Sequence, residues 1–197
     1  RPSNKNWVGK NWACFVGTKD LESDWLLFLD ADVVVGERSI YNALAKSYKE
    51  DIDLLSLAPK VNCNCLAEWL VQPIMTSLLI IGFPISSTNN KKSNTAFAAG
   101  PFMLFKKNSY NKIGGHKDTY NQVVEDLVLA QKIKNNNLKL NFSLAIEDIS
   151  LNMYKDFNSL IEGWSKNWFL GLERDIFKSF SASTFVFFIY PLPWLIL

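Results

Sequence analysis

Trp25-Leu26-Leu27-Phe28-Leu29-Asp30-Ala31-Asp32 is the stretch of sequence that decides the class of fold. Its first five residues form a continuous apolar run of strand length, which predicts a strand covered on both faces, as in the sheets of α/β proteins. Such sheets bind ligands beyond the carboxyl ends of their strands. Asp30 and Asp32 follow the run directly, so we expect both carboxylates at a ligand-binding edge.

Strand and helix patterns alternate along the rest of the chain. Strand patterns cover residues 53–57, 102–105 and 139–144, the first of them stopped by Pro59, and helix patterns cover residues 39–48, 124–134 and 157–177. This alternation predicts an α/β fold with a sheet flanked by helices.

Composition excludes several classes of protein. With 197 residues, 48% of them hydrophobic and 20% charged, the chain is neither a disordered tail nor a small disulfide scaffold. Its 21 Lys and Arg against 19 Asp and Glu give a net charge of +2, too small for a protein that neutralises many phosphates. We therefore expect no nucleic-acid partner. The three cysteines fit neither a zinc site nor a disulfide framework, which favours idle thiols.

Two stretches, residues 69–90 and 179–197, carry no charge. The first is interrupted by two prolines and a glycine, which favours a buried or interfacial helix. The second approaches the roughly 20 apolar residues of a membrane span, so we expect residues 1–178 to form one domain and residues 179–197 to begin a membrane segment. Because the chain starts at Arg1 and ends inside this run, we interpret it as a piece of a longer protein.

Two acidic motifs are candidates for chemistry. Asp30 and Asp32, two positions apart, can reach one hard cation, Mg²⁺ or Mn²⁺, and its diphosphate ligand, or they can be solvated turn residues. Glu125 and Asp126 open a predicted helix, where acidic side chains complement the helix dipole or, in a pocket, act as a general base.

Glycines mark two further segments. Gly100 precedes the strand that begins at Phe102, and Gly114-Gly115 precedes His116, the only histidine. Glycine permits a close backbone approach to a ligand or a tight turn. A lone histidine is more often structural than a ligand.

These segments, in this order, resemble the inverting family 2 glycosyltransferases of the GT-A fold. Four matches carry the resemblance: Trp7-Val8-Gly9-Lys10-Asn11-Trp12-Ala13, Asp30-Ala31-Asp32, the run from Ala99 to Phe105, and Glu125-Asp126. The resemblance implies that Lys10 lies beside the donor nucleotide, that Asp32 binds the metal with help from Asp30, and that Asp126 is the catalytic base. The run from Ala99 to Phe105 is similar to the family's acceptor-side segment.

Within the family, the chain looks most like the membrane-bound lipid glycosylators related to carotenoid-acid (diaponeurosporenoate) and hopanoid-associated glycosyltransferases. The segments responsible are residues 114–116, 124–126, 153–154 and 163–167. Processive members carry Gln-x-x-Arg-Trp, whereas this chain has Trp164-Ser165-Lys166-Asn167-Trp168, which argues against a polysaccharide synthase. Lys166 is a candidate to replace the arginine near the diphosphate. The family's opening strand and its nucleotide-ring contacts are expected before residue 1.

The resemblance implies metal-dependent transfer of a sugar, with inversion, from a nucleotide-diphosphate sugar to a lipid-like acceptor. The expected pocket residues are Gly100, Phe102, Glu125, Lys166 and Trp168. Because Lys-rich sequence precedes the apolar segment, we expect the catalytic domain on the cytoplasmic side of the cell membrane. Two alternatives remain open: a nucleotidyltransferase of the same fold, and a non-catalytic membrane-attached binding protein.

Overall fold

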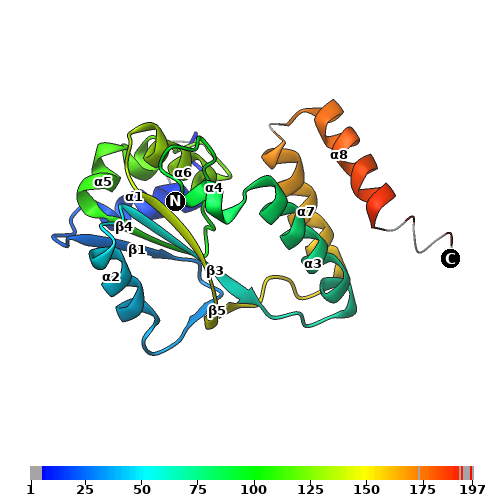
Figure 1. The fold of residues 1–197 in the computed structure, drawn as a ribbon, viewed down its shortest axis with the longest axis horizontal. Helices are drawn as coiled ribbons and strands as arrows, with labels where there is room; N and C mark the ends of the chain where they lie inside the picture. Colours follow the sequence, from blue (N-terminus) through cyan, green and yellow to red (C-terminus); the bar gives the residue numbers. More distant parts are fainter. Residues whose placement is uncertain (1–5, 173, 191, 193–195, 197) are drawn as a thin grey trace. The chain divides into compact units, whose positions relative to one another are not determined.

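The computed structural model describes residues 6–172, 174–190, 192 and 196 (Figure 1). The chain divides into two compact units. The first, here called the sheet unit, contains residues 1–62 and 79–153, and the second, the helical unit, contains residues 63–78 and 154–197.

In the described residues, the sheet unit holds one five-stranded sheet with the order β1-β4-β3-β5-β2. The strands are β1 (Trp25–Leu29), β2 (Val33–Val35), β3 (Leu54–Val61), β4 (Phe102–Lys106) and β5 (Leu140–Leu151). Only β3 and β5 pair in parallel, while β4 pairs antiparallel with β1 and β3, and β2 pairs antiparallel with β5. The sheet is therefore mixed, and the predicted α/β class is confirmed.

Helices cover both faces of the sheet because its strands are apolar on both sides. Met103 and Phe105 of β4 belong to one buried cluster with Leu129 and Ile133 of α6 (Glu125–Asn135). Their neighbours along the strand face the other way, as the two-residue period of a strand requires, and join a second cluster with α2 (Ser39–Lys49). Figure 1 shows α2 on one side of the sheet and α6 on the other.

Shorter helices complete the sheet unit. These are α1 (Gly9–Thr18), α4 (Ile85–Asn89), α5 (Lys107–Lys112) and the 3₁₀ turn η1 (Gly115–Lys117). Gly114 has φ 80° and precedes η1, so this position favours glycine.

The helical unit consists of residues 66–78 of α3 (Leu66–Gly82), α7 (Phe157–Gly171) and α8 (Ile176–Ile189). Glu68 joins its two chain segments: the buried carboxylate accepts hydrogen bonds from the backbone N–H of Asn64 at 2.7 Å and of Tyr154 at 3.2 Å. Asp156 begins α7 with a capping box, in which its Oδ1 accepts from the N–H of Ser159 at 2.8 Å.

Some boundaries predicted from sequence were wrong. The single helix expected over residues 157–177 is two helices, because Arg174 takes a left-handed φ of 61° and Asp175 caps a new helix by accepting from Phe177 N–H and Lys178 N–H. The strand expected to stop at Pro59 continues to Val61. A register irregularity between Pro59 and Lys60 accommodates the proline, which cannot donate to the ladder.

Strand β1 is covered on both faces, as predicted, although it lies at one end of the described sheet and pairs only with β4 there. Leu26 and Phe28 belong to or pack against the cluster on the α6 side. Trp25 and Leu27 pack against the cluster on the α2 side. Only its last residue, Leu29, is 42% exposed.

In the described residues, the two charge-free stretches contribute to helices α3, α4 and α8. Residues 69–90 contain most of α3 and all of α4, with Pro73 inside α3, and Trp69 and Leu70 are exposed. The stretch expected to begin a membrane segment at Ser179 lies in α8 up to Ile189; residues 191, 193–195 and 197 are outside the described residues. Within the part of the chain that the structure describes, no helix has the length and apolar character needed to cross a membrane.

Candidate functional site

The end of β1 and the start of β4 meet in the sheet unit. Leu29 pairs with Phe102, and the backbone N–H of Asp30 donates to the Pro101 carbonyl at 3.2 Å. This pairing sets Asp30 opposite the Gly100-Pro101 segment. Antiparallel register therefore brings together two sequence motifs that lie far apart along the chain.

Lys10 connects this strand end to the start of α6. Its Nζ atom lies 2.8 Å from Oδ1 of Asp30 and 2.8 Å from Oε1 of Glu125. Burial acts to lower the pKa of Lys10, but Glu125 and Asp30 together raise that pKa well above its ordinary value. The ammonium group is therefore charged and shared by two carboxylates.

Hydrogen bonds join the segment before α6 to the start of α1, and they bring Lys10 close to Glu125. The Val8 N–H donates to the Tyr120 carbonyl at 2.8 Å. Asn11, which is fully buried, donates through Nδ2 to the carbonyls of Thr119 and Gln122. Sequence reasoning missed Asn11, since nothing but its place beside Lys10 distinguishes it from other asparagines.

Asp126 is held by two backbone donors. Its Oδ2 accepts from the Gly100 N–H at 3.0 Å, and its Oδ1 accepts from the Leu127 N–H at 2.8 Å. Burial, followed by the charge of Glu125, raises the pKa of Asp126 to about 6, against the opposing effect of these hydrogen bonds and of Lys10. A carboxyl group with this pKa is ionised near neutral pH and is a stronger base than an ordinary aspartate.

Asp32 lies in the turn between β1 and β2 and is exposed. The turn is closed by a hydrogen bond of 3.2 Å from the Val33 N–H to the Asp30 carbonyl. Among the residues that the structure describes, no group of three or more Asp, Glu, His or Cys side chains is placed to hold a metal. The two aspartates still fit a magnesium-type site, because such an ion is commonly held by one or two carboxylates, water and substrate phosphates.

The remaining predicted site residues lie in different surroundings. Phe102 has no exposed surface and packs in the core cluster on the α2 side of the sheet. Lys166 and Trp168 belong to α7 of the helical unit, where the Trp168 Nε1 donates to Ser183 Oγ of α8 at 3.2 Å. The geometry thus groups Lys10, Asp30, Gly100, Glu125 and Asp126 within the sheet unit, and the pocket roles of Phe102, Lys166 and Trp168 stay predictions.

His116 has a structural environment. It is fully buried, and its Nδ1 lies 2.9 Å from the Tyr110 hydroxyl. Burial, together with the charge of Lys10, lowers the pKa of His116 to about 4, so the ring is neutral near pH 7.

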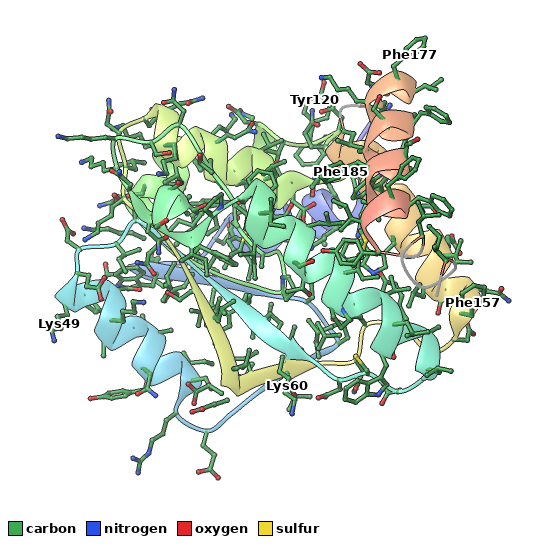
Figure 2. The ribbon with its side chains drawn as sticks, turned by 45° about the vertical axis from the view of Figure 1, so that its right-hand side comes forward. Lys49, Lys60, Tyr120, Phe157, Phe177 and Phe185 are labelled. Atoms are coloured by element: carbon green, nitrogen blue, oxygen red, sulfur yellow. The ribbon has the colours of Figure 1, made fainter. Side chains whose placement is uncertain are left out.

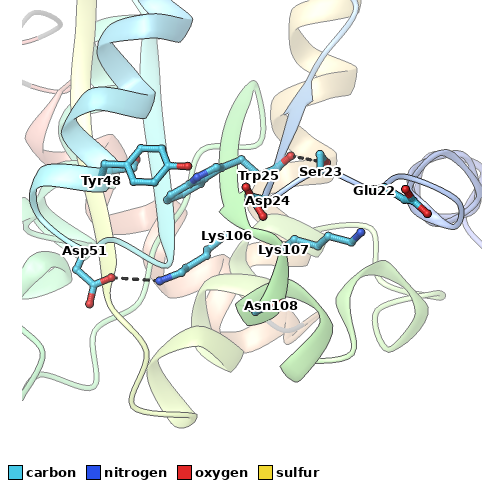
Figure 3. Close-up of a pocket in the computed structure, with 10 residues that line it drawn as sticks. Glu22, Ser23, Asp24, Trp25, Tyr48, Asp51, Lys106, Lys107 and Asn108 are labelled. Carbon is cyan, nitrogen blue, oxygen red and sulfur yellow. Dashed lines mark hydrogen bonds and ion pairs between the residues drawn. The ribbon is translucent and has the colours of Figure 1, made fainter.

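A surface cavity of about 480 Å³ lies elsewhere in the sheet unit (Figure 3). Trp25, at the opposite end of β1 from Asp30, lines it together with Tyr48 and the ion pair of Lys106 and Asp51. None of the site residues predicted from sequence lines this cavity. The Lys10 and Asp126 cluster is therefore the candidate site.

Comparison with known proteins finds relatives that match most of this chain. The chain is 27% identical over 172 residues to the 4,4'-diaponeurosporenoate glycosyltransferase of Staphylococcus haemolyticus (strain JCSC1435), covering 86% of this chain and 46% of that protein. It is also 27% identical over 164 residues to the protein of the same name from Staphylococcus aureus (strain MRSA252), covering 82% of this chain and 44% of that protein. The chain thus spans about half the length of the curated relatives it matches. The model of Glycosyl transferase family 2 matches residues 1–114, more than half of the chain, and the chain therefore belongs to glycosyl transferase family 2.

Proposed function

We propose that the chain is part of a GT-A-type enzyme that transfers a sugar, with inversion, from a nucleotide-diphosphate sugar to a lipid-like acceptor. The observation that carries this proposal is the cluster in which Lys10 joins Asp30 and Glu125, next to Asp126. Its members come from the start of α1, the end of β1 and the start of α6, and it combines a cation for phosphate with a raised-pKa carboxylate for a base.

The donor side of the site consists of Lys10, Asp30 and Asp32. The Lys10 ammonium, with a side chain that is 43% exposed, is available to the diphosphate oxygens as a positive partner. Asp30 and Asp32 are the residues that would hold Mg²⁺ or Mn²⁺ by their carboxylates. When bound, such an ion neutralises charge on the diphosphate leaving group.

Asp126 is the proposed general base for the acceptor hydroxyl. As the acceptor hydroxyl attacks the anomeric carbon from the face opposite the diphosphate, the sugar–phosphate bond breaks and the configuration inverts. Asp126 takes the hydroxyl proton, and its backbone bonds to Gly100 and Leu127 keep the carboxylate in one orientation. If the acceptor is a carboxylic acid, it is already ionised near neutral pH, and Asp126 then orients it.

Two observations support a lipid-like acceptor: the exposed aromatic residues of α8 in the helical unit and the name of the relatives. The relatives are named as glycosyltransferases of 4,4'-diaponeurosporenoate. In α8, Phe177 is 86% exposed, Phe180 73% and Phe185 61%, and no residue of this helix is buried (Figure 2). Large exposed apolar surfaces mark membrane or partner contacts. We propose that this surface binds the cytoplasmic face of the cell membrane.

A donor screen tests the proposal. The full-length protein is incubated with Mn²⁺ and each common nucleotide-diphosphate sugar, with and without membrane lipid extract, and released nucleoside diphosphate is measured. We expect release from one donor, stimulated by lipid. Release of pyrophosphate from a nucleoside triphosphate and a sugar phosphate would indicate a nucleotidyltransferase instead, and donor binding without turnover would indicate a binding protein.

A further inference from the structure

We infer that Glu125 is a positioning residue for the donor side of the site: it holds the Lys10 ammonium in place. This inference rests on the proposed function, and it assigns to Glu125 a role different from the acceptor contact that the sequence suggested.

Glu125 is too buried to contact an acceptor. Its side chain is only 5% exposed, while that of Lys10 is 43% exposed and that of Asp30 is 31% exposed. An acceptor therefore has almost no surface of Glu125 to contact. The Oε1 atom of Glu125 instead lies 2.8 Å from the Lys10 Nζ. A buried carboxylate needs such a partner, because desolvation disfavours an isolated charge.

Two carboxylates restrict the position of the Lys10 ammonium group. A lysine side chain is long and flexible, so one carboxylate restricts its ammonium group less than two do. Here the two carboxylates come from different elements, Asp30 from the end of β1 and Glu125 from the start of α6. Asp30 is also a proposed metal ligand. Glu125 is thus the partner that can keep Lys10 in place while a nucleotide diphosphate occupies the site.

The expected consequence is selective for the donor. Without the charge of Glu125, Lys10 pairs with Asp30 alone, and its ammonium group loses that partner whenever Asp30 turns to the metal. Asp126 keeps its hydrogen bonds to Gly100 and Leu127, which do not involve Glu125. Loss of the Glu125 charge lowers the Asp126 pKa toward its ordinary value, but burial, the larger cause of the raised pKa, remains. Donor KM should therefore rise, while acceptor KM stays unchanged.

Steady-state kinetics on the full-length protein test this, using the donor that the wild type turns over. We expect Glu125→Gln to raise donor KM about tenfold and to change kcat less than about threefold. Glu125→Asp, which keeps the charge on a shorter side chain, should recover part of the loss. Glu37→Gln, which removes an exposed carboxylate of the same unit, is the matched control and should behave as wild type.

A double-mutant cycle separates positioning from a general structural effect. If Glu125 acts through Lys10, Lys10→Met and the double variant Lys10→Met/Glu125→Gln should have the same donor KM within about twofold. Additive effects, or a rise in acceptor KM instead of donor KM, would overturn the inference and leave the proposed function standing.

A misfolded variant and an inactive wild type would each have a defined consequence. The circular dichroism spectrum shows whether Glu125→Gln folds. If it does not, Glu125→Asp replaces it in the cycle with Lys10→Met, and a donor KM of Glu125→Asp equal to that of wild type overturns the inference. If the wild type turns over no nucleotide sugar, the proposed function fails, and the donor-side role of Glu125 fails with it.

Discussion

The backbone N–H of Gly100 donates a hydrogen bond of 3.0 Å to Oδ2 of Asp126. This bond joins the segment before β4 to the start of α6. Because Leu127 N–H binds the other carboxylate oxygen, both oxygens of Asp126 are oriented by main-chain groups. The orientation of the proposed base thus depends on how closely the backbone at Gly100 approaches it.

Gly100→Ala should therefore impair the chemical step. A Cβ atom at this position would lie 3.1 Å from Oδ2 of Asp126 and 3.6 Å from Nζ of Lys10, so the carboxylate has to shift by a few tenths of an ångström. We expect kcat to fall about tenfold, since small displacements of reacting groups are costly. Gly17→Ala is the control, because a Cβ there meets nothing within 4 Å. Equal kcat values for the two variants would contradict the role given to this contact.

The raised pKa of Asp126 predicts a pH dependence of stability that needs no substrate. The pKa is about 6 in the folded chain, against an ordinary value of 3.8, so the native state binds more protons than the unfolded state between these values. Stability from this group is therefore fully present below pH 3.8 and is lost as the pH rises through about 6.

Asp126→Asn should remove that loss. We expect the free energy of unfolding of the variant, relative to wild type, to increase between pH 4 and pH 7, as measured by urea denaturation at each pH; the window follows from the same two pKa values. A difference that does not change over this range would mean that the Asp126 carboxyl titrates at its ordinary pKa.

Local patterns predicted four strands of the described sheet and the helices α2 and α6, because these elements carry apolar runs or periodicities of their own; α1, α5 and β2 were not predicted. The strand at Trp25–Leu29 and the helix that begins at Ser39 have the predicted starting residues. Long-range pairing was not predictable in this way: β2 has only three residues, and it forms because Val33–Val35 pair with β5, more than a hundred positions later.

In the candidate site, too, the individual residues were predictable from sequence and their long-range contacts were not. The positions of Asp30 after a strand and of Asp126 at a helix start identified these two residues, whereas Lys10 was predicted only from the resemblance to family 2 glycosyltransferases. Sequence could not show that Lys10 bridges Asp30 and Glu125, because that contact depends on the antiparallel register of β1 and on the bonds from Asn11 to the segment before α6. For the same reason, sequence could not distinguish a buried Glu125 from a pocket-lining one.

Asp32→Ala should abolish metal-dependent nucleotide binding without affecting the fold. Asp32 is exposed in a turn, and surface substitutions of this kind change stability by about 0.5 kcal/mol or less. Calorimetric titration of the full-length protein with UDP and Mn²⁺ should show no metal-dependent heat for this variant. Asp20→Ala, another exposed aspartate of the sheet unit, should keep it. Unchanged binding by Asp32→Ala would remove this residue from the proposed metal site.

Membrane binding should depend on the aromatic residues of α8. Phe180 is 73% exposed, so Phe180→Glu leaves the core intact while it places a charge in the apolar surface. We expect the full-length variant to bind phosphatidylglycerol vesicles more weakly in a flotation assay at high salt. Ser181→Glu adds the same charge next to it without removing an aromatic ring and should float more than Phe180→Glu. Equal flotation of the two variants would argue against insertion of Phe180.

The effect of Asp126→Asn on catalysis should depend on the chemistry of the acceptor. An alcohol has a pKa far above that of any carboxylate, so its proton must leave as the new bond forms, and general-base help is worth about 10²–10⁴-fold in rate. Asparagine keeps the size of the side chain but cannot accept the proton. With an alcohol acceptor, kcat should fall by that factor while donor KM barely moves, because the carboxylates of Asp30 and Asp32 are untouched.

With a carboxylic-acid acceptor, no proton has to be removed, so the same variant should lose far less activity. Steady-state kinetics with one alcohol and one carboxylic acid of the same chain length, for wild type and variant, compare the two cases directly. Because donor, metal and protein are shared, the ratio of the two losses isolates proton transfer from orientation. If Asp126→Asn keeps full activity on the alcohol, Asp126 is not the base, and another group must accept the proton.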